Sequence, residues 1–207
     1  KNIQEFNENC DTKNITVAFM GGGFRMKIFK QVVLPALERL AVKKNIVVFY
    51  PEQKQKNIEK SNKINKNLKL VEIPRSLSLD LTLFRYGAQK PDILIHCGPD
   101  IKNNLYKTEN SLINAVQLGA ILVASAVPPY KGENNKKQRF VLAENTEISW
   151  YETLLDLIEN PVKRKEIYNN ALEYCKGKYD PKKIEKVINE ELIKVKNTDY
   201  AEMLRRY

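Results

Sequence analysis

The sequence predicts a doubly wound α/β fold: a Rossmann-like parallel sheet of about six strands, helices on both faces, and extra helices at the C-terminal end. Three observations predict this fold. Short apolar runs alternate along the chain with segments whose apolar residues follow helical spacing. These runs are apolar at most positions, as in strands buried on both faces of a sheet. Strands that alternate with helices form parallel sheets, and right-handed crossovers then place helices on both faces.

Six segments are predicted to be strands. The first, NITVAFM, contains β-branched residues and ends at three glycines, and the second, NIVVFY, ends at a proline. The third, LKLVEI, alternates apolar and polar residues before another proline. The fourth, DILIH, ends at Cys-Gly-Pro, and the fifth, AILVAS, is followed by a short sixth. In chain order, the predicted strands cover residues 14–20, 45–50, 68–73, 92–96, 120–125 and 139–143.

Helices are predicted between and after these strands. Thr108 is expected to cap one helix, and the segment from Ser149 to Glu152 fits the S-x-x-E capping box of another. Prolines follow Asn160 and Asp180, as expected at first helical positions. The Lys- and Asn-rich stretch 52–67 is predicted to be a solvated loop or a frayed helix. The predicted helices cover residues 24–42, 76–89, 108–118, 149–159, 161–177 and 181–197.

The domain organisation predicted from these segments is simple. Residues 14–197 are predicted to form one Rossmann-like domain, because the sequence has no internal repeat and no second core. Residues 1–13 are polar and without periodicity, so they are interpreted as a linker or tail. Residues 198–207 are interpreted as a C-terminal tail or a further helix. The chain starts at Lys1 rather than at Met, so we expect it to be part of a longer protein.

Composition excludes several classes of function. The 207 residues include 3 cysteines without a C-x-x-C pair and 1 histidine, which argues against a disulfide framework and a Cys/His zinc site. No apolar run approaches the roughly 20 residues that span a bilayer, and a cytoplasmic location is expected. The net charge of +10 is mostly scattered lysine, so no nucleic-acid partner is expected. Peripheral association with the inner face of an anionic membrane stays open.

Candidate binding residues follow the predicted strands. Ligands of open α/β sheets bind beyond the carboxyl ends of the strands, and helix N-termini there favour anions. Glycines and cations after the first strand suit a diphosphate. The candidates after the strands are Gly22, Gly23, Arg25, Lys27, Arg75 and His96. Those at the start of the 108–118 helix are Lys107, Thr108, Glu109 and Asn110.

Each of these signals also has a structural interpretation. The three glycines either cradle a phosphate or form a tight turn between strand and helix. Arg25 and Lys27 either bind a diphosphate or lie on a solvated helix face. His96 is either a general acid or base or a structural residue with satisfied nitrogens. A nucleophilic role for Cys97 is disfavoured, because strand alternation turns its side chain away from His96.

A resemblance to a known family comes from the stretch LYKTENSLINAVQLGAILVASAVPPY, residues 105–130. It resembles the donor-binding core of GT-B glycosyltransferases, and most closely the bacterial polysaccharide enzymes. MGGGFRMKIF resembles the Gly-rich loop of their C-terminal domain, and DILIHCGPD resembles the strand and loop before the donor helix. SWYETLLDLIENPVKRKEIYNNALEY resembles the segment that closes such domains. Together these segments extend over about residues 14–195.

The resemblance implies a nucleotide-sugar-binding domain. It implies that the backbone of Gly22 and Gly23 approaches the pyrophosphate. It also implies that Arg25 or Lys27, together with Lys107, neutralises the leaving diphosphate without a metal ion or other cofactor. Glu109 and Asn110 would lie near the donor sugar or ribose.

The sequence departs from the family at the usual E-x7-E pair. Asn114 stands where many relatives have the glutamate that holds the ribose, and Tyr106 stands at the partner position. Asn114 can form a hydrogen bond but carries no charge. Ribose binding and recognition of the donor sugar therefore stay unassigned, and no catalytic residue is assigned.

The resulting expectation is a transferase domain that binds a nucleotide-sugar donor. The acceptor, a glycan or lipid-linked saccharide, would bind an N-terminal domain that is missing here, so the chain alone is expected to be inactive. The first alternative is a diverged, non-catalytic binding module, which the missing E-x7-E pair keeps open. The second is a nucleotide-sugar epimerase, which is disfavoured because one histidine and few carboxylates lie near the predicted cleft.

Overall fold

The computed structural model describes residues 5–6, 11–52, 65–132 and 137–197. The predicted linker lies mostly outside these ranges, as do the predicted tail and most of the 52–67 stretch. Contacts divide the chain into two compact units, residues 1–171 and residues 172–207. The first unit contains the sheet and the candidate site.

The sheet confirms the predicted fold class. Its six strands are all parallel, in the order β3-β2-β1-β4-β5-β6. The order reverses between β1 and β4, and such a reversal is where open α/β sheets bind their ligands. The strands are β1 (Asn14–Phe19), β2 (Asn45–Pro51), β3 (Leu68–Ile73), β4 (Ile93–His96), β5 (Ile121–Ser125) and β6 (Val141–Ala143).

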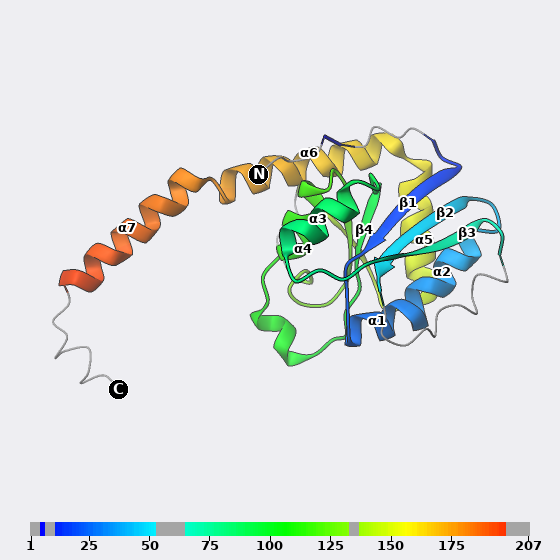
Figure 1. Ribbon diagram of the computed structural model, residues 1–207, viewed down its shortest axis with the longest axis horizontal. Helices are drawn as coiled ribbons and strands as arrows, with labels where there is room; N and C mark the ends of the chain where they lie inside the picture. Colours follow the sequence, from blue (N-terminus) through cyan, green and yellow to red (C-terminus); the bar gives the residue numbers. More distant parts are fainter. Residues whose placement is uncertain (1–4, 7–10, 53–64, 133–136, 198–207) are drawn as a thin grey trace. The chain divides into compact units, whose positions relative to one another are not determined.

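Helices cover both faces of this sheet (Figure 1). On one face α2 (Leu34–Leu40) packs against α5 (Glu147–Glu159), and on the other α3 (Leu79–Gly87) contacts α4 (Asn110–Gln117). The central strands are buried on both sides, with Val17, Val48 and Leu122 fully inaccessible. Burial on both faces explains why these strands are continuous apolar runs in the sequence.

The predicted helix 24–42 is interrupted. It consists of α1 (Phe24–Ile28), a π-helical segment (Phe29–Val33) and α2, and it ends at Leu40. Pro35 lies in the first turn of α2 and has no N–H to donate to the preceding turn. A wide π turn directly before the proline accommodates this missing donor.

Two predicted helix caps are wrong. A short 3₁₀ helix (Lys102–Tyr106) precedes α4, so the chain enters α4 at Asn110 with Glu109 at the N-cap position and no capping by a side chain. In α5 the N-cap is Thr146, whose hydroxyl accepts a hydrogen bond from the Ser149 amide at 3.3 Å. Thr146 has the extended backbone of an N-cap residue, so α5 begins at Glu147, two residues before Ser149.

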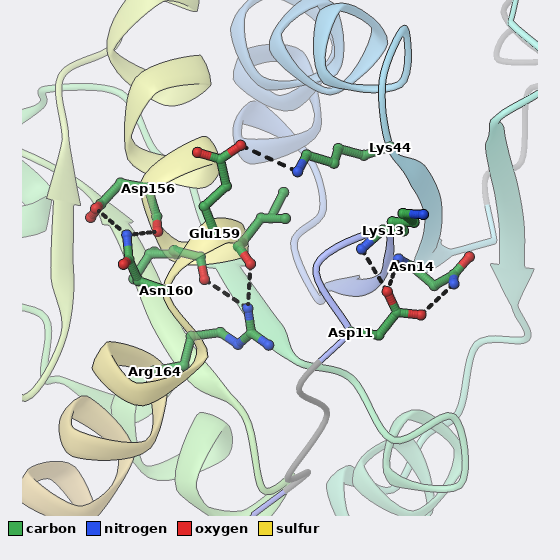
Figure 2. Close-up of polar contacts among 10 residues, drawn as sticks. Asp11, Lys13, Asn14, Lys44, Asp156, Glu159, Asn160 and Arg164 are labelled. Carbon is green, nitrogen blue, oxygen red and sulfur yellow. Dashed lines mark hydrogen bonds and ion pairs between the residues drawn. The ribbon is translucent and has the colours of Figure 1, made fainter.

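The junction after α5 is held by polar contacts (Figure 2). The buried Arg164 donates to the backbone carbonyls of Leu157 and Ile158, at 2.7 and 3.1 Å. These carbonyls lie in the last turn of α5, where they have no partner within the helix. Lys44, after α2, forms an ion pair of 3.2 Å with Glu159 and ties the two helices together.

The last two helices are α6 (Pro161–Lys178), which crosses from the first unit into the second, and α7 (Pro181–Asn197). Pro181 is the first residue of α7 as predicted, and the Asp180 carboxylate before it accepts a hydrogen bond from the amide of Lys182 at 3.0 Å. None of the helices in the described ranges is long and apolar enough to cross a membrane.

Candidate functional site

Two pockets lie at the carboxyl ends of β1 and β4, where the strand order reverses. The larger has a volume of about 310 Å³ and the smaller about 180 Å³. Arg25 and His96 line both of them. The larger pocket is also lined by Gly22, Gly23, Phe24, Gly98, Pro99, Ile101, Asn104 and Lys107. The smaller is also lined by Phe19, Met20, Gly21, Leu79, Thr82, Leu94, Ile95, Ser111 and Asn114.

The glycine loop forms one wall of these pockets. Gly23 has a positive φ of 54°, so this position is strained for any residue with a Cβ atom. Gly21 packs so closely that a Cβ there would collide with the Phe19 ring and lie 2.9 Å from the Arg25 Cβ. Gly22 faces open space. The loop is therefore both a tight turn and an exposed stretch of backbone at the pocket.

Two cationic side chains from distant parts of the sequence line the larger pocket. Arg25 lies in the first turn of α1, and Lys107 follows the 3₁₀ helix before α4. Both act electrostatically on His96, so their charges converge at one place. Lys27 is exposed on α1 and does not line either pocket. Of the two predicted alternatives after the glycine loop, Arg25 is the one beside the pocket.

His96 is held as a neutral imidazole. Burial, followed by the charges of Arg25 and Lys107, lowers its pKa to about 3. Its Nδ1 lies 2.6 Å from the Ser111 hydroxyl, and its ring packs edge-on against Tyr130 at 5.1 Å. A general base works best with a pKa near the operating pH, so this residue is a poor one. These contacts favour the structural interpretation of His96, with a ring that can still hydrogen-bond a ligand.

Cys97 has no features of a nucleophile. Its side chain is fully buried and its thiol donates to the carbonyl of Arg25 at 3.4 Å. Burial raises the pKa of this thiol to about 12, so the reactive thiolate is scarcely populated at neutral pH.

Besides Lys27, four more predicted site residues do not line either pocket. Glu109 points inward, with 5% of its surface exposed, and forms an ion pair of 3.8 Å with Arg139. Arg75 donates to the backbone carbonyl of Glu52 at 2.8 Å. Thr108 and Asn110 are exposed where the chain enters α4. Asn114, which replaces the family glutamate, does line the smaller pocket.

Several pocket residues were not predicted as site residues. Asn104 is nearly buried, and its amide group donates to the carbonyl of Pro99 at 2.6 Å. Ser111 and Thr82 line the smaller pocket from α4 and α3. The sequence carries no signal for Asn104, because the 3₁₀ helix that turns it inward lacks the periodicity of longer helices. Ser111 could have been found, since it lies in the first turn of a helix at the predicted ligand-binding edge.

The chemistry available in the pocket is anion binding. Arg25 and Lys107 supply positive charge, Gly22 and Gly23 expose backbone, and His96 supplies a neutral ring. Metal binding has less support: within the described ranges, no group of three or more His, Cys, Asp or Glu side chains could hold a metal ion.

Comparison with solved structures identifies the fold. The chain is similar to TarM from S. aureus, with 17% identity and a TM-score of 0.61 over 96% of this chain and 38% of TarM. It is similar to HepE from Anabaena, solved with UDP and glucose, with 13% identity and a TM-score of 0.61 over 88% of this chain and 49% of HepE. A third match is the C-terminal domain of LpcC, a group 1 glycosyl transferase from Francisella tularensis. The identity is 14% and the TM-score 0.56, over 81% of this chain and 86% of that domain.

These matches confirm the predicted resemblance at the level of the fold. The chain has the fold of the C-terminal domain of GT-B glycosyltransferases. It spans well under two thirds of the length of TarM and HepE and most of the LpcC C-terminal domain. No protein-family model and no curated protein sequence matches the chain.

Proposed function

We propose that this chain is the donor-binding domain of a glycosyltransferase, and that it binds a nucleoside-diphosphate sugar in the larger pocket. The observation that carries the proposal is the convergence of Arg25, Lys107 and the glycine loop on that pocket. A diphosphate needs cations and backbone donors in a concave site, and helix starts nearby favour its charge. HepE, which shares the fold, was solved with UDP-glucose.

In the proposed reaction, this domain would stabilise the nucleoside diphosphate as it leaves the donor sugar. Negative charge grows on the diphosphate as the bond to the sugar breaks, and fixed cations stabilise that charge. Arg25 and Lys107 would supply this stabilisation, with no metal ion required. The acceptor, a glycan or lipid-linked saccharide, would bind a domain outside this chain, because the chain matches only part of TarM and HepE. The chain alone would then bind a donor without transferring its sugar.

The two alternatives differ in what the pocket must do. A non-catalytic module with a degenerate donor site would bind no nucleotide diphosphate, and Asn114 in place of the family glutamate is the residue that supports it. An epimerase would need groups that exchange protons near neutral pH. The lowered pKa of His96 argues against such a role for the only histidine in the chain.

A binding panel tests the proposal. We expect one of UDP, GDP, ADP or dTDP to raise the melting temperature of the chain by several degrees, equally with Mg²⁺ or with a chelator. Ligand at 100 times its Kd adds about 2.7 kcal/mol to the free energy of unfolding, which is enough for such a shift. No shift with any of the four at millimolar concentration would support the degenerate module. A shift only with Mg²⁺ would contradict metal-independent binding.

A further inference from the structure

We propose that Asn145 is a positioning residue for diphosphate binding, acting with Ser125 through the loop that carries Lys107. The proposal rests on the proposed donor site. Neither Asn145 nor Ser125 lines the pocket; Ser125 lies on β5, the strand next to β4, and Asn145 follows β6, the next strand along the sheet. Ser125 is the last residue of β5, and Asn145 follows the edge strand β6 by two residues.

The two side chains hold the Gly98 residue from both sides. The Gly98 amide donates to the Ser125 hydroxyl at 3.1 Å, and the Asn145 amide group donates to the Gly98 carbonyl at 2.9 Å. The Ser125 hydroxyl in turn donates to the Asn145 side-chain oxygen at 2.6 Å, which closes the ring of hydrogen bonds. Ser125 and Gly98 are buried and Asn145 is half-buried, so water is largely excluded from the bond between Gly98 and Ser125.

From Gly98 the hydrogen bonds continue to the cation. The next residue, Pro99, accepts from the side chain of Asn104 at 2.6 Å, and the backbone carbonyl of Asn104 accepts from the amide of Lys107 at 3.2 Å. Gly98, Pro99, Asn104 and Lys107 all line the larger pocket. The hydrogen bonds of Ser125 and Asn145 therefore anchor the start of the loop 98–107, and Lys107 is the last residue of that loop.

These hydrogen bonds restrict the conformational freedom of the loop that carries Lys107. Lys107 is exposed, and a lysine on an unanchored loop would lose much of its affinity for a ligand to conformational freedom. Anchoring the loop at its base keeps the pocket wall in one place before the ligand arrives. Loss of the anchor would move the wall and Lys107 while leaving the sheet intact.

The test compares Asn145→Ala with Thr146→Ala. Thr146 is the neighbouring residue and caps α5, so its replacement destabilises the same region without touching Gly98. Kd values for UDP and UMP are measured by calorimetry well below both melting temperatures. We expect Asn145→Ala to weaken UDP binding about tenfold and UMP binding less, whereas Thr146→Ala changes either Kd less than about twofold.

A double-mutant cycle with Lys107→Ala tests the route of the effect. If Asn145 acts through the loop to Lys107, Asn145→Ala costs much less UDP affinity once Lys107 is already alanine. Equal UDP affinity of Asn145→Ala and the unsubstituted chain would overturn the proposal and leave the donor site standing. The proposal would also be overturned if the loss of UDP affinity in the double variant equalled the sum of the losses in Asn145→Ala and Lys107→Ala. Failure of the unsubstituted chain to bind UDP, GDP, ADP or dTDP would overturn the donor site, and the role of Asn145 with it.

Discussion

Replacing both Arg25 and Lys107 with alanine is expected to abolish measurable binding of nucleoside diphosphate. Both residues line the larger pocket, and both charges act on His96 within it. A hydrogen bond to a charged group contributes about 1.5–3 kcal/mol, so each single substitution should weaken binding about tenfold to a hundredfold. The measurement is a calorimetric titration with UDP, GDP, ADP and dTDP, using whichever binds the unsubstituted chain.

Lys27→Ala is the matched control for these variants. Lys27 lies two residues after Arg25 and carries the same charge, but it is exposed and lines neither pocket. Its replacement removes one positive charge from the same helix and should change the Kd less than about threefold, because exposed charges are screened by solvent and salt. A loss with Lys27→Ala as large as with Arg25→Ala would show that only the overall charge attracts the ligand. That result would contradict the assigned pocket.

Alanine at Gly22 should weaken binding without loss of stability, whereas alanine at Gly21 should destabilise the fold. A Cβ at Gly22 meets nothing within 4 Å, so Gly22→Ala should leave the melting temperature nearly unchanged. The same Cβ would stand where a phosphate must approach the backbone, and we expect UDP binding to weaken about tenfold. A Cβ at Gly21 collides with the Phe19 ring, so Gly21→Ala should lose about 1–3 kcal/mol of stability.

Thermal denaturation and UDP titration of both variants separate the two interpretations of the glycine loop. If the loop only makes a tight turn, Gly22→Ala should bind UDP as well as the unsubstituted chain does. If the loop cradles a phosphate, Gly22→Ala should be stable and deficient in binding. Full binding by Gly22→Ala would remove the backbone of this loop from the proposed site.

The sheet could be predicted from the sequence because its strands are buried on both faces. Burial forces β1, β2 and β5 to be apolar runs, and such runs are visible without knowledge of the partner strands. The pocket followed from one topological rule, since parallel strands end at a common edge. This rule placed Gly22, Gly23, Arg25, His96 and Lys107 at the edge where the structure brings them together.

What could not be predicted depends on contacts between distant residues. Glu109 was expected near the ligand, but Arg139, thirty positions later, pairs with it inside the protein. Thr108 was expected to cap α4, but after the preceding 3₁₀ helix the N-cap position falls one residue later, on Glu109. The Asn145 ring depends on a loop after β6 meeting a loop after β4. Neither the residue types nor their spacing in the sequence indicates that these two loops are in contact.

The most direct test of diphosphate binding in the larger pocket is the proton NMR signal of the His96 ring during titration with UDP. The chain has 1 histidine, so the assignment is unambiguous. Burial, Arg25 and Lys107 lower the pKa of the free protein's His96 to about 3, and a bound diphosphate would counter the two cations and raise it.

We therefore predict that UDP shifts the His96 signal with the same Kd as calorimetry gives. We also predict that the pKa of His96 is higher in the complex than in the free protein, as measured from the pH dependence of the same signal. If GDP, ADP or dTDP binds in place of UDP, the same titration is made with that diphosphate. Saturation by a diphosphate that leaves the His96 signal and its pKa unchanged would contradict binding in the larger pocket and place the ligand elsewhere.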